Sequence, residues 1–152
     1  MIHEQDVQKL LNYITSHFGI DPERWFHPEG YQSIALAILD SIYSTGNRYT
    51  GVLNLVNRYR GLRANEGSHP EADTATDLIE TFYRWGGVDE FVLKTNNRWR
   101  TSSQIHAPYK AYAALEAAKV LAGHSIESIS DVVDRFDSRE SREHSDIARE
   151  WL

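Results

Sequence analysis

The sequence of 152 residues contains no cysteine and only one methionine. The absence of cysteine excludes disulfide bonds, a thiol nucleophile, an iron–sulfur cluster and a cysteine-ligated zinc site. No run of residues approaches the roughly 20 apolar residues that a membrane-spanning helix needs. Residues 1–30 also lack a signal-peptide pattern. We therefore expect a cytoplasmic protein with no membrane partner.

Common nucleotide- and metal-binding motifs are missing as well. The sequence has no Walker loop, no G-x-G-x-x-G fingerprint, no H-E-x-x-H motif and no G-x-S-x-G elbow. Its seven histidines are scattered, and no two of them lie four residues apart, as they would on one face of a metal-binding helix. We therefore expect no metal and no cofactor.

The residues that are present predict a folded helical protein. Hydrophobic residues make up 41% of the chain and include four tryptophans and eight tyrosines, which is too many for a disordered protein. Apolar residues recur at helical spacing, and no alternating strand pattern competes with them. We predict an all-α fold, a compact bundle of seven or eight short helices in a single domain over residues 1–152. The predicted helices cover residues 6–18, 31–44, 49–60, 74–85, 89–95, 108–122 and 128–136, and a last charged segment covers 138–152.

Charge is distributed unevenly along the chain, whose formal net charge is −6. No acidic residue occurs from Ser41 to Ala64, the first acid-free run, or from Phe91 to Leu115, the second acid-free run, and each run carries four basic residues. The rest of the chain holds 8 basic residues against 22 acidic residues. Basic surfaces attract phosphate groups, so the two runs predict one anion-binding face, although half-exposed loops sometimes show such gaps.

The first acid-free run contains a polar turn between two predicted helices. Its serine and asparagine side chains can donate hydrogen bonds to phosphates or base edges, its arginine supplies charge, and its tyrosines can stack on bases. The alternative is a structural turn with both tyrosines packed on the core. Asp40, just before the turn, is a candidate general base, or else a structural carboxylate that pairs with Arg48 or caps a helix. The candidate DNA-binding residues of the turn are Tyr43, Ser44, Asn47, Arg48 and Tyr49.

The second acid-free run contains a polar loop that leads into the helix expected from Pro108. Basic residues and hydroxyl groups alternate there with aromatic residues just before a helix N-terminus, where free amides and the helix dipole attract anions. This composition predicts a phosphate-contacting loop, and the alternative is a solvated loop with Trp99 packed inward. The candidate DNA-binding residues are Arg98, Arg100, Thr101, Ser102, Ser103, His106 and Lys110.

The order of these segments resembles the helix-hairpin-helix superfamily of DNA glycosylases, the endonuclease III-like proteins, over about residues 34–152. The segment LAILDSIYSTGNRYTGVLNLVNRY resembles their buried helix, minor-groove-probing turn and following helix. The segment APYKAYAALEAAKVL resembles a stretch in which a Lys-Ala pair, here Lys110 and Ala111, opens a helix that ends in a leucine, here Leu121. The resemblance implies that Tyr43 belongs to a wedge that fills the gap left by a flipped base.

The sequence departs from this family at its signature. The family's Leu-Pro-Gly-x-Gly hairpin and the catalytic aspartate after it would begin near Trp151–Leu152, and neither is found. The Cys-ligated cluster of some members is absent too. We therefore expect that a further segment or chain completes the domain, or that a carboxylate within the sequence, with Asp40 as the candidate, acts instead.

The resemblance implies a DNA-binding protein of DNA-glycosylase type with double-stranded DNA as its partner. Such an enzyme hydrolyses the N-glycosidic bond of a base rotated out of the stack, here a modified base such as one in phage DNA. The alternative is a non-catalytic helical module that binds nucleic acid or protein, with the helix over 111–122 and Trp151 as its partner surface. A third hypothesis is a small-molecule pocket lined by Trp25, Phe26, Trp85 and Trp99.

Overall fold

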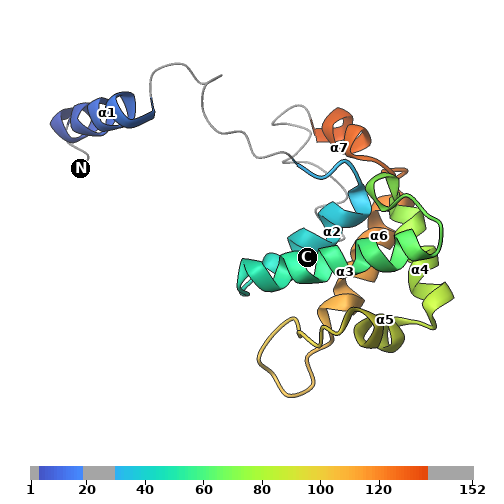
Figure 1. The fold of residues 1–152 in the computed structure, drawn as a ribbon. Coiled ribbons are helices and arrows are strands. Elements are labelled where there is room, and N and C mark those ends of the chain that lie inside the picture. The colour runs from blue at the N-terminus through green and yellow to red at the C-terminus, as the bar shows by residue number, and fades with distance from the viewer. Residues whose placement is uncertain (1–3, 19–29, 137–152) are drawn as a thin grey trace. The chain divides into compact units, whose positions relative to one another are not determined.

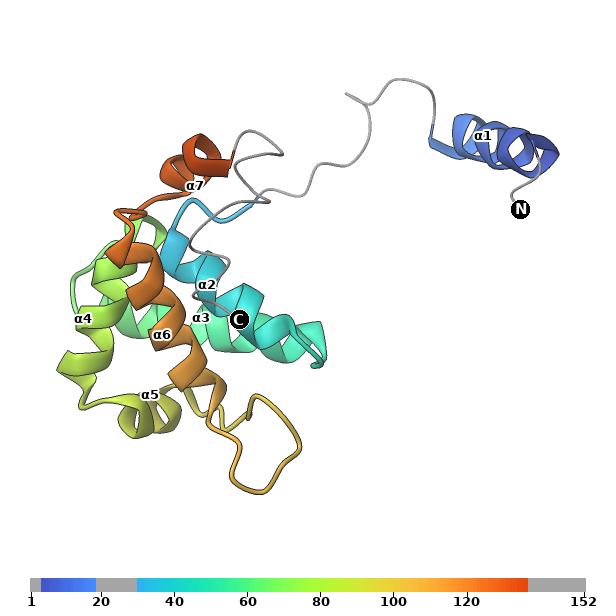
Figure 2. The same ribbon diagram turned by 180° about the vertical axis from the view of Figure 1, so that it is seen from behind.

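A computed structural model describes residues 4–18 and 30–136 of the chain (Figures 1 and 2). The chain divides into two units, Met1–Gly30 and Tyr31–Leu152, and each is described by itself. The described residues form seven α-helices and one short 3-10 helix, with no strand among them, which confirms the all-α prediction. None of the described helices is long and apolar enough to cross a membrane. That residues 1–152 form one domain stays a prediction. The helices are α1 (Glu4–Phe18), α2 (Ile34–Ser44), α3 (Tyr49–Asn65), η2 (Pro70–Ala72), α4 (Ala75–Trp85), α5 (Val88–Thr95), α6 (Lys110–Gly123) and α7 (Ile129–Phe136).

The predicted helices match these elements to within two residues at each end, except that α2 begins at Ile34 rather than at residue 31 and α3 ends later than predicted. Helix α3 continues past Gly61 to Asn65, because the side chain of Arg63 is held in the core and supports the last turn. Helix α6 begins at Lys110 rather than at Pro108, since Tyr109 is its extended N-cap residue. The predicted segment over residues 138–152 lies outside the described residues.

Helix α1 is the described part of the first unit. It places apolar residues at helical spacing, yet Val7, Leu10 and Leu11 are exposed within this unit. An apolar stripe of this kind is typical of a helix that packs against another surface.

Helix α2 lies at the centre of the second unit. Ser33 begins it, because its hydroxyl accepts a hydrogen bond from the Leu36 amide and so satisfies one of the free donors of the first turn. The side chains of Leu36 and Leu39 are completely buried. Burial of each such side chain contributes about 1.5–3 kcal/mol to folding.

Helix α6 packs closely against α2 and α4 through small side chains. Ala111, Ala114 and Ala118 recur on one face of α6, and all three are completely inaccessible to solvent. Because alanine has only a methyl side chain, the helix axes can approach each other closely. This face of the helix, which the alternative hypothesis offers as a partner surface, is therefore an internal packing surface.

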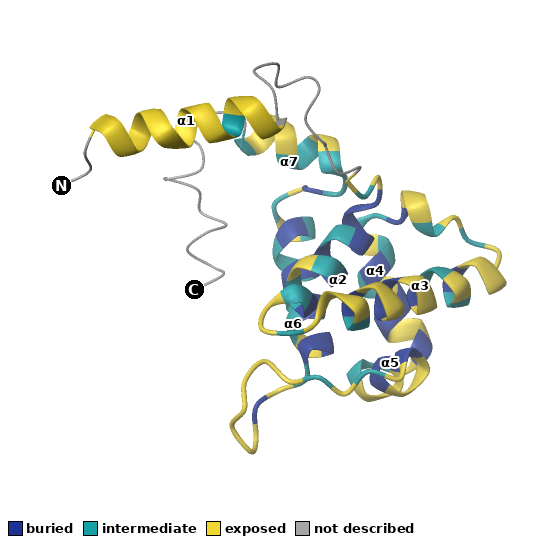
Figure 3. Cartoon of the chain, turned by 60° about the vertical axis from the view of Figure 1, so that its left-hand side comes forward, coloured by how far each residue is buried: buried dark blue, intermediate teal, exposed yellow. Residues whose placement is uncertain are grey.

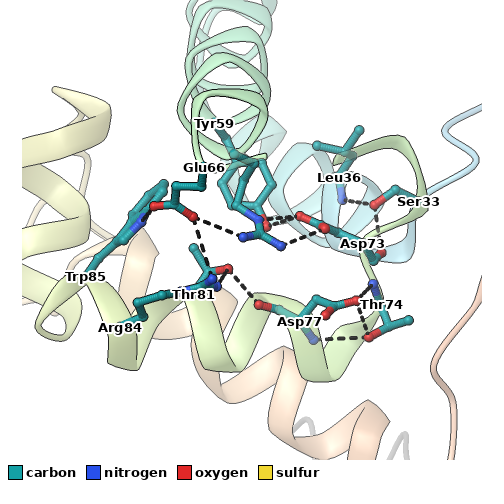
Figure 4. A network of polar contacts seen from close by, with 11 residues as sticks. Ser33, Leu36, Tyr59, Glu66, Asp73, Thr74, Asp77, Thr81, Arg84 and Trp85 are labelled. Carbon is teal, nitrogen blue, oxygen red and sulfur yellow. Dashed lines mark hydrogen bonds and ion pairs between the residues drawn. The ribbon is translucent and has the colours of Figure 1, made fainter. Parts of the chain in front are cut away.

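A buried ion pair ties the end of α3 to the segment before α4 (Figure 4). Two of the three guanidinium nitrogens of Arg63, Nε and Nη2, donate to the carboxylate of Asp73, at 2.8 and 2.9 Å. The Tyr59 hydroxyl donates to the same carboxylate at 2.7 Å, and Asp73 raises the pKa of that hydroxyl together with burial, which is the larger cause. Since every charged group here has a partner, the pair fixes the connection between α3 and α4.

Candidate functional site

The two acid-free runs meet in the folded second unit. The indole of Trp99, from the second run, lies directly against the backbone of Gly51 in α3. Its ring also lies 6.2 Å from the ring of Tyr43 at the end of α2. Farther along α3, the Arg58 guanidinium donates to the carbonyl oxygen of Thr95 at 3.4 Å. Residues of both runs therefore lie together in the fold, and that they form an anion-binding face stays a prediction.

A polar pocket of about 270 Å³ lies where the runs meet. One wall is a single face of α3, because its four residues recur at spacings of three and four. The other wall is the end of α5 and the segment after it, where Asn96 adopts a left-handed conformation with φ of 51°. None of the described residues that line this pocket is acidic. The lining residues are Gly51, Asn54, Leu55, Arg58, Thr95, Asn96, Asn97, Arg98 and Trp99.

Arg58 and Arg98 give this pocket its positive charge. Both side chains are exposed, and neither forms an ion pair within residues 4–18 and 30–136. Asn54, Asn96 and Asn97 add amide groups that can donate hydrogen bonds. Two unpaired guanidinium groups with neighbouring amides are the chemistry that binds a phosphate or another oxyanion.

A second hollow of about 360 Å³ lies between α2, α6 and α7 and has the opposite character. Side chains such as Ile38, Ile42 and Phe136 line it, and Ser41 is the single polar residue among the described residues of its lining. An apolar groove offers no partner to a charged group. The anion-binding candidate is therefore the pocket at Trp99, which we call the arginine pocket.

Tyr43 lies in the core, which corrects the prediction that it contacts DNA. Its side chain is completely buried, and burial raises the pKa of its hydroxyl. As residue i+7 from Leu36 and i+4 from Leu39, it continues the buried face of α2. A side chain in this position cannot probe a duplex or fill a gap in it.

Two further turn residues hold the turn itself together. The Ser44 hydroxyl donates to the carbonyl and the carboxylate of Asp40, at 2.7 and 2.9 Å. The Asn47 amide donates to the carbonyl oxygens of Tyr43 and Thr45, at 3.2 and 3.0 Å. The structural alternative given for this turn is thus the one that the geometry favours for Ser44 and Asn47.

Arg48 and Tyr49 remain on the surface at the beginning of α3. The Tyr49 side chain is 55% exposed, and its hydroxyl donates to Asp40 at 3.1 Å. The Tyr31 hydroxyl donates to the same carboxylate oxygen at 2.7 Å, and partial burial and this carboxylate raise the pKa of Tyr31. Asp40 therefore accepts hydrogen bonds from three hydroxyl groups, those of Tyr31, Ser44 and Tyr49. Within the described residues, Asp40 and Arg48 form no ion pair.

The residues predicted from the second run differ in their surroundings. Arg98 lines the arginine pocket. Arg100 is turned back onto its own loop, where its guanidinium donates to the Ala107 carbonyl and lies 4.5 Å from the Tyr109 ring centre. Both arginines are exposed, and so are four further candidates of this loop. The Thr101 hydroxyl donates to the Pro108 carbonyl, and the Ser102 hydroxyl accepts from the Gln104 amide. The four are Thr101, Ser102, Ser103 and His106.

Lys110 is buried, which corrects its assignment as a DNA contact. Only 3% of its surface is exposed, and burial lowers the pKa of its ammonium group. Its Nζ donates to the carbonyl oxygens of Ile42, at 2.9 Å, and of Thr45 at the end of α2. Carbonyl groups at a helix C-terminus have no hydrogen-bond donor within the helix, so the ammonium group of Lys110 acts as the donor for them.

The sequence reasoning missed four residues that line the arginine pocket: Asn54, Arg58, Asn96 and Asn97. A signal was present, because Gly51, Asn54, Leu55 and Arg58 follow helical spacing and would share one face. The amides of residues 96 and 97 carry no such signal, since only the fold brings that segment next to α3.

The other hypotheses find less support in the described residues. Trp85 is buried in the core against Phe91, and its Nε1 donates to Glu66, so it is not beside Trp99 in a pocket. Trp25, Phe26 and Trp151 lie outside the described residues. Within the described ranges, no group of three or more metal-ligating side chains gathers in one place.

Comparisons with known proteins add a family but no activity. No curated protein and no solved structure matches this chain. The resemblance to helix-hairpin-helix glycosylases therefore stays a prediction. One family model, described as a domain of unknown function (DUF8548), matches residues 8–152. Since this match covers nearly the whole sequence, the chain belongs to the DUF8548 family.

Proposed function

We propose that this protein binds double-stranded DNA through its phosphate backbone, with the arginine pocket as the main contact. The observation that carries the proposal is the meeting of the two acid-free runs around Arg58 and Arg98. The chain as a whole is acidic. A surface on which none of the described residues is acidic, and on which two arginines have no ion pair within the described ranges, is suited to a polyanion.

The surroundings of the arginine pocket support a backbone contact. Arg48, at the N-terminus of α3, is exposed in the same acid-free run. Asn54 and Asn97 can donate amide hydrogens to phosphate oxygens beside the arginines. Contacts to phosphate fix the position of a protein on a duplex and carry no sequence information themselves. We therefore expect binding with little sequence preference.

A salt titration with a fluorescein-labelled duplex tests this proposal. Each phosphate that the protein neutralises contributes about 0.9 to the slope of log affinity against log salt concentration. Arg58→Ala and Arg98→Ala should each flatten the slope by about one unit. Arg135→Ala is the matched control, because Arg135 is an exposed arginine on α7. Helix α7 lies at the end of this unit away from α5, whose C-terminal end lines the arginine pocket (Figures 1 and 2). The proposal is contradicted if the affinity does not depend on salt concentration, or if all three variants change the salt slope equally.

Base excision is a second candidate function, and the surroundings of Asp40 favour it. An exposed aromatic side chain, Tyr49, donates a hydrogen bond to this carboxylate. A group that can stack on a base therefore contacts the candidate general base directly. A carboxylate there would activate water or stabilise the sugar cation during hydrolysis of an N-glycosidic bond.

Excision has a separate test. Duplexes that carry modified bases are incubated with the protein and then heated in alkali, which breaks the strand at each abasic site. Strand breaks with the wild type that disappear with Asp40→Asn are the expected result. Ser41→Ala, a change at an exposed neighbour on α2, is the control. If the wild type yields no breaks on any duplex, the DNA-binding role stands alone.

A further inference from the structure

Ile105 is the most exposed large hydrophobic residue of the described chain. Of its surface, 85% is accessible to solvent. It belongs to the loop of residues 100–109, between α5 and α6, which projects from the second unit in Figures 1 and 2 and is coloured almost entirely as exposed in Figure 3. A single exposed isoleucine needs no explanation on most surfaces, but this one belongs to a projecting loop.

The base of this loop is closed by backbone hydrogen bonds. The Thr101 amide donates to the Pro108 carbonyl at 3.0 Å, and the Lys110 amide donates to the Trp99 carbonyl at 2.8 Å. A short antiparallel bridge also joins Arg100 to Tyr109. The two arms are therefore held together, and the residues between them are presented outward.

The surroundings of Ile105 indicate the chemistry of its partner. The loop belongs to the second acid-free run, so the loop itself offers no carboxylate to a basic partner. Ser102 and Ser103 offer hydroxyl donors on the same loop, and both are exposed. Trp99, at the base of the loop, also lines the arginine pocket. A partner that meets both features is an anionic polymer with an apolar interior, which describes the stacked base pairs of a duplex between their phosphate strands.

We propose that Ile105 enters a groove of the bound duplex, packs as a wedge against a base-pair step and bends the DNA. Proteins that bind the minor groove insert isoleucine, leucine or phenylalanine between base steps in this way and kink the helix by partial unstacking. The base pairs stay intact, and the arginine pocket holds a neighbouring phosphate. This inference rests on the proposed DNA binding, and it adds a bending activity to it.

A duplex labelled at its two ends with a donor and an acceptor dye measures the bend. Binding of the wild type should bring the ends together and raise the energy transfer. Ile105→Ser should bind with an unchanged salt slope, about tenfold weaker since the burial of the side chain is lost, and should leave the ends apart. Ile105→Leu should restore bending. Leu93→Ser is the matched control, because Leu93 is an exposed apolar residue on α5 and is 55% accessible.

The outcomes separate the two proposals. Salt-dependent binding without any bend, or a bend that Ile105→Ser retains, overturns the wedge and leaves the DNA-binding proposal in place. Absence of salt-dependent binding overturns both. Sedimentation of the free protein tests the other possible partner of the loop, which is a second copy of this chain. A wild-type dimer that Ile105→Ser converts to a monomer would assign the loop to self-association and overturn the wedge.

Discussion

The indole ring of Trp99 occupies the space in which a side chain at position 51 would lie. A β-carbon added to Gly51 would stand 2.7 Å from Cζ2 of Trp99, a distance that non-bonded carbon atoms do not reach. The ring also packs beside Tyr43, so it cannot retreat into the core without displacing that residue. The absence of a side chain at position 51 is thus what lets the second acid-free run lie against α3.

Gly51→Ala should displace Trp99 and distort the arginine pocket. Overpacking of this kind costs about 1–3 kcal/mol of folding free energy, which urea unfolding will measure. Labelling with 5-fluorotryptophan gives one fluorine signal for each of the four tryptophans. We expect the Trp99 signal, assigned from Trp99→Phe, to move and the affinity for DNA to fall.

Gly61→Ala is the matched control for this experiment. Gly61 also lies within α3, but nothing stands within 4 Å of a β-carbon added there. Alanine is the better helix former, so this variant should be more stable than the wild type by about 0.5–1 kcal/mol. If Gly51→Ala is also stabilising and leaves the Trp99 signal in place, the contact does not constrain the pocket.

Asp73→Asn should strongly destabilise the second unit. The substitution leaves the buried guanidinium of Arg63 with only the partly exposed carboxylate of Glu66 as a counter-charge. Removal of one partner of a buried pair costs about 3–5 kcal/mol. The free energy of unfolding in urea measures this loss. The double variant Arg63→Met with Asp73→Leu removes both charges and should recover part of it. If the free energy of unfolding of Asp73→Asn lies within about 0.5 kcal/mol of the wild-type value, the ion pair contributes little to stability.

The sequence predicted most helices because their ends and faces carry local signals. Thr74 and Asp77 form a capping box at the start of α4 in which both hydrogen bonds are made, and the two residues are only three apart in the sequence. Gly86 ends α4 in a left-handed conformation with φ of 101°, which glycine adopts at little cost. Such signals lie within a few residues of one another, so a single sequence suffices to find them.

The candidate site was harder to predict because it depends on the directions of side chains. The acid-free runs indicated which segments would meet, but Tyr43 and Tyr49 look alike in the sequence while one is buried and the other exposed. The helical spacing from Leu36 and Leu39 could have separated them. No local pattern places Lys110 at the end of α2, since that contact joins segments 68 residues apart.

Glu66→Gln should change how stability depends on pH. Burial alone would raise the pKa of Glu66, but hydrogen bonds from Trp85 and Arg63 and the charge of Arg84 outweigh it and lower the pKa below the ordinary value of 4.5. The folded state therefore holds this carboxylate ionised at lower pH than the unfolded state does. Its contribution to stability is present above about pH 4.5 and is lost as the pH falls through the lower, folded pKa.

The measurement is the free energy of unfolding in urea at several values of pH. The wild type should exceed Glu66→Gln near neutral pH, and the difference should shrink as the pH falls below about 4.5. Glu80→Gln serves as the control, because Glu80 is an exposed residue of α4 with no ion pair in the described part of the chain. A difference that stays constant across this window would show that the ionisation of Glu66 is not linked to folding.

Lys110→Met separates a structural lysine from a phosphate-binding one. Methionine keeps the length of the chain but cannot donate, so the carbonyl oxygens of Ile42 and Thr45 lose their partner. An unsatisfied buried carbonyl costs about 1–3 kcal/mol. We expect this loss in urea unfolding, together with faster hydrogen exchange at the Asn47 amide, which is bonded to Ser44 within the same turn.

Lys119→Met is the matched control, since Lys119 lies on the same helix, pairs with Glu116 at the surface and should cost no more than about 1 kcal/mol. The salt titration adds an independent test of the role of Lys110. A buried lysine that caps α2 releases no counterion from DNA, so Lys110→Met should leave the salt slope unchanged even where affinity falls. A slope that flattens by about one unit while stability stays at the wild-type value would mean that Lys110 leaves the core to contact phosphate.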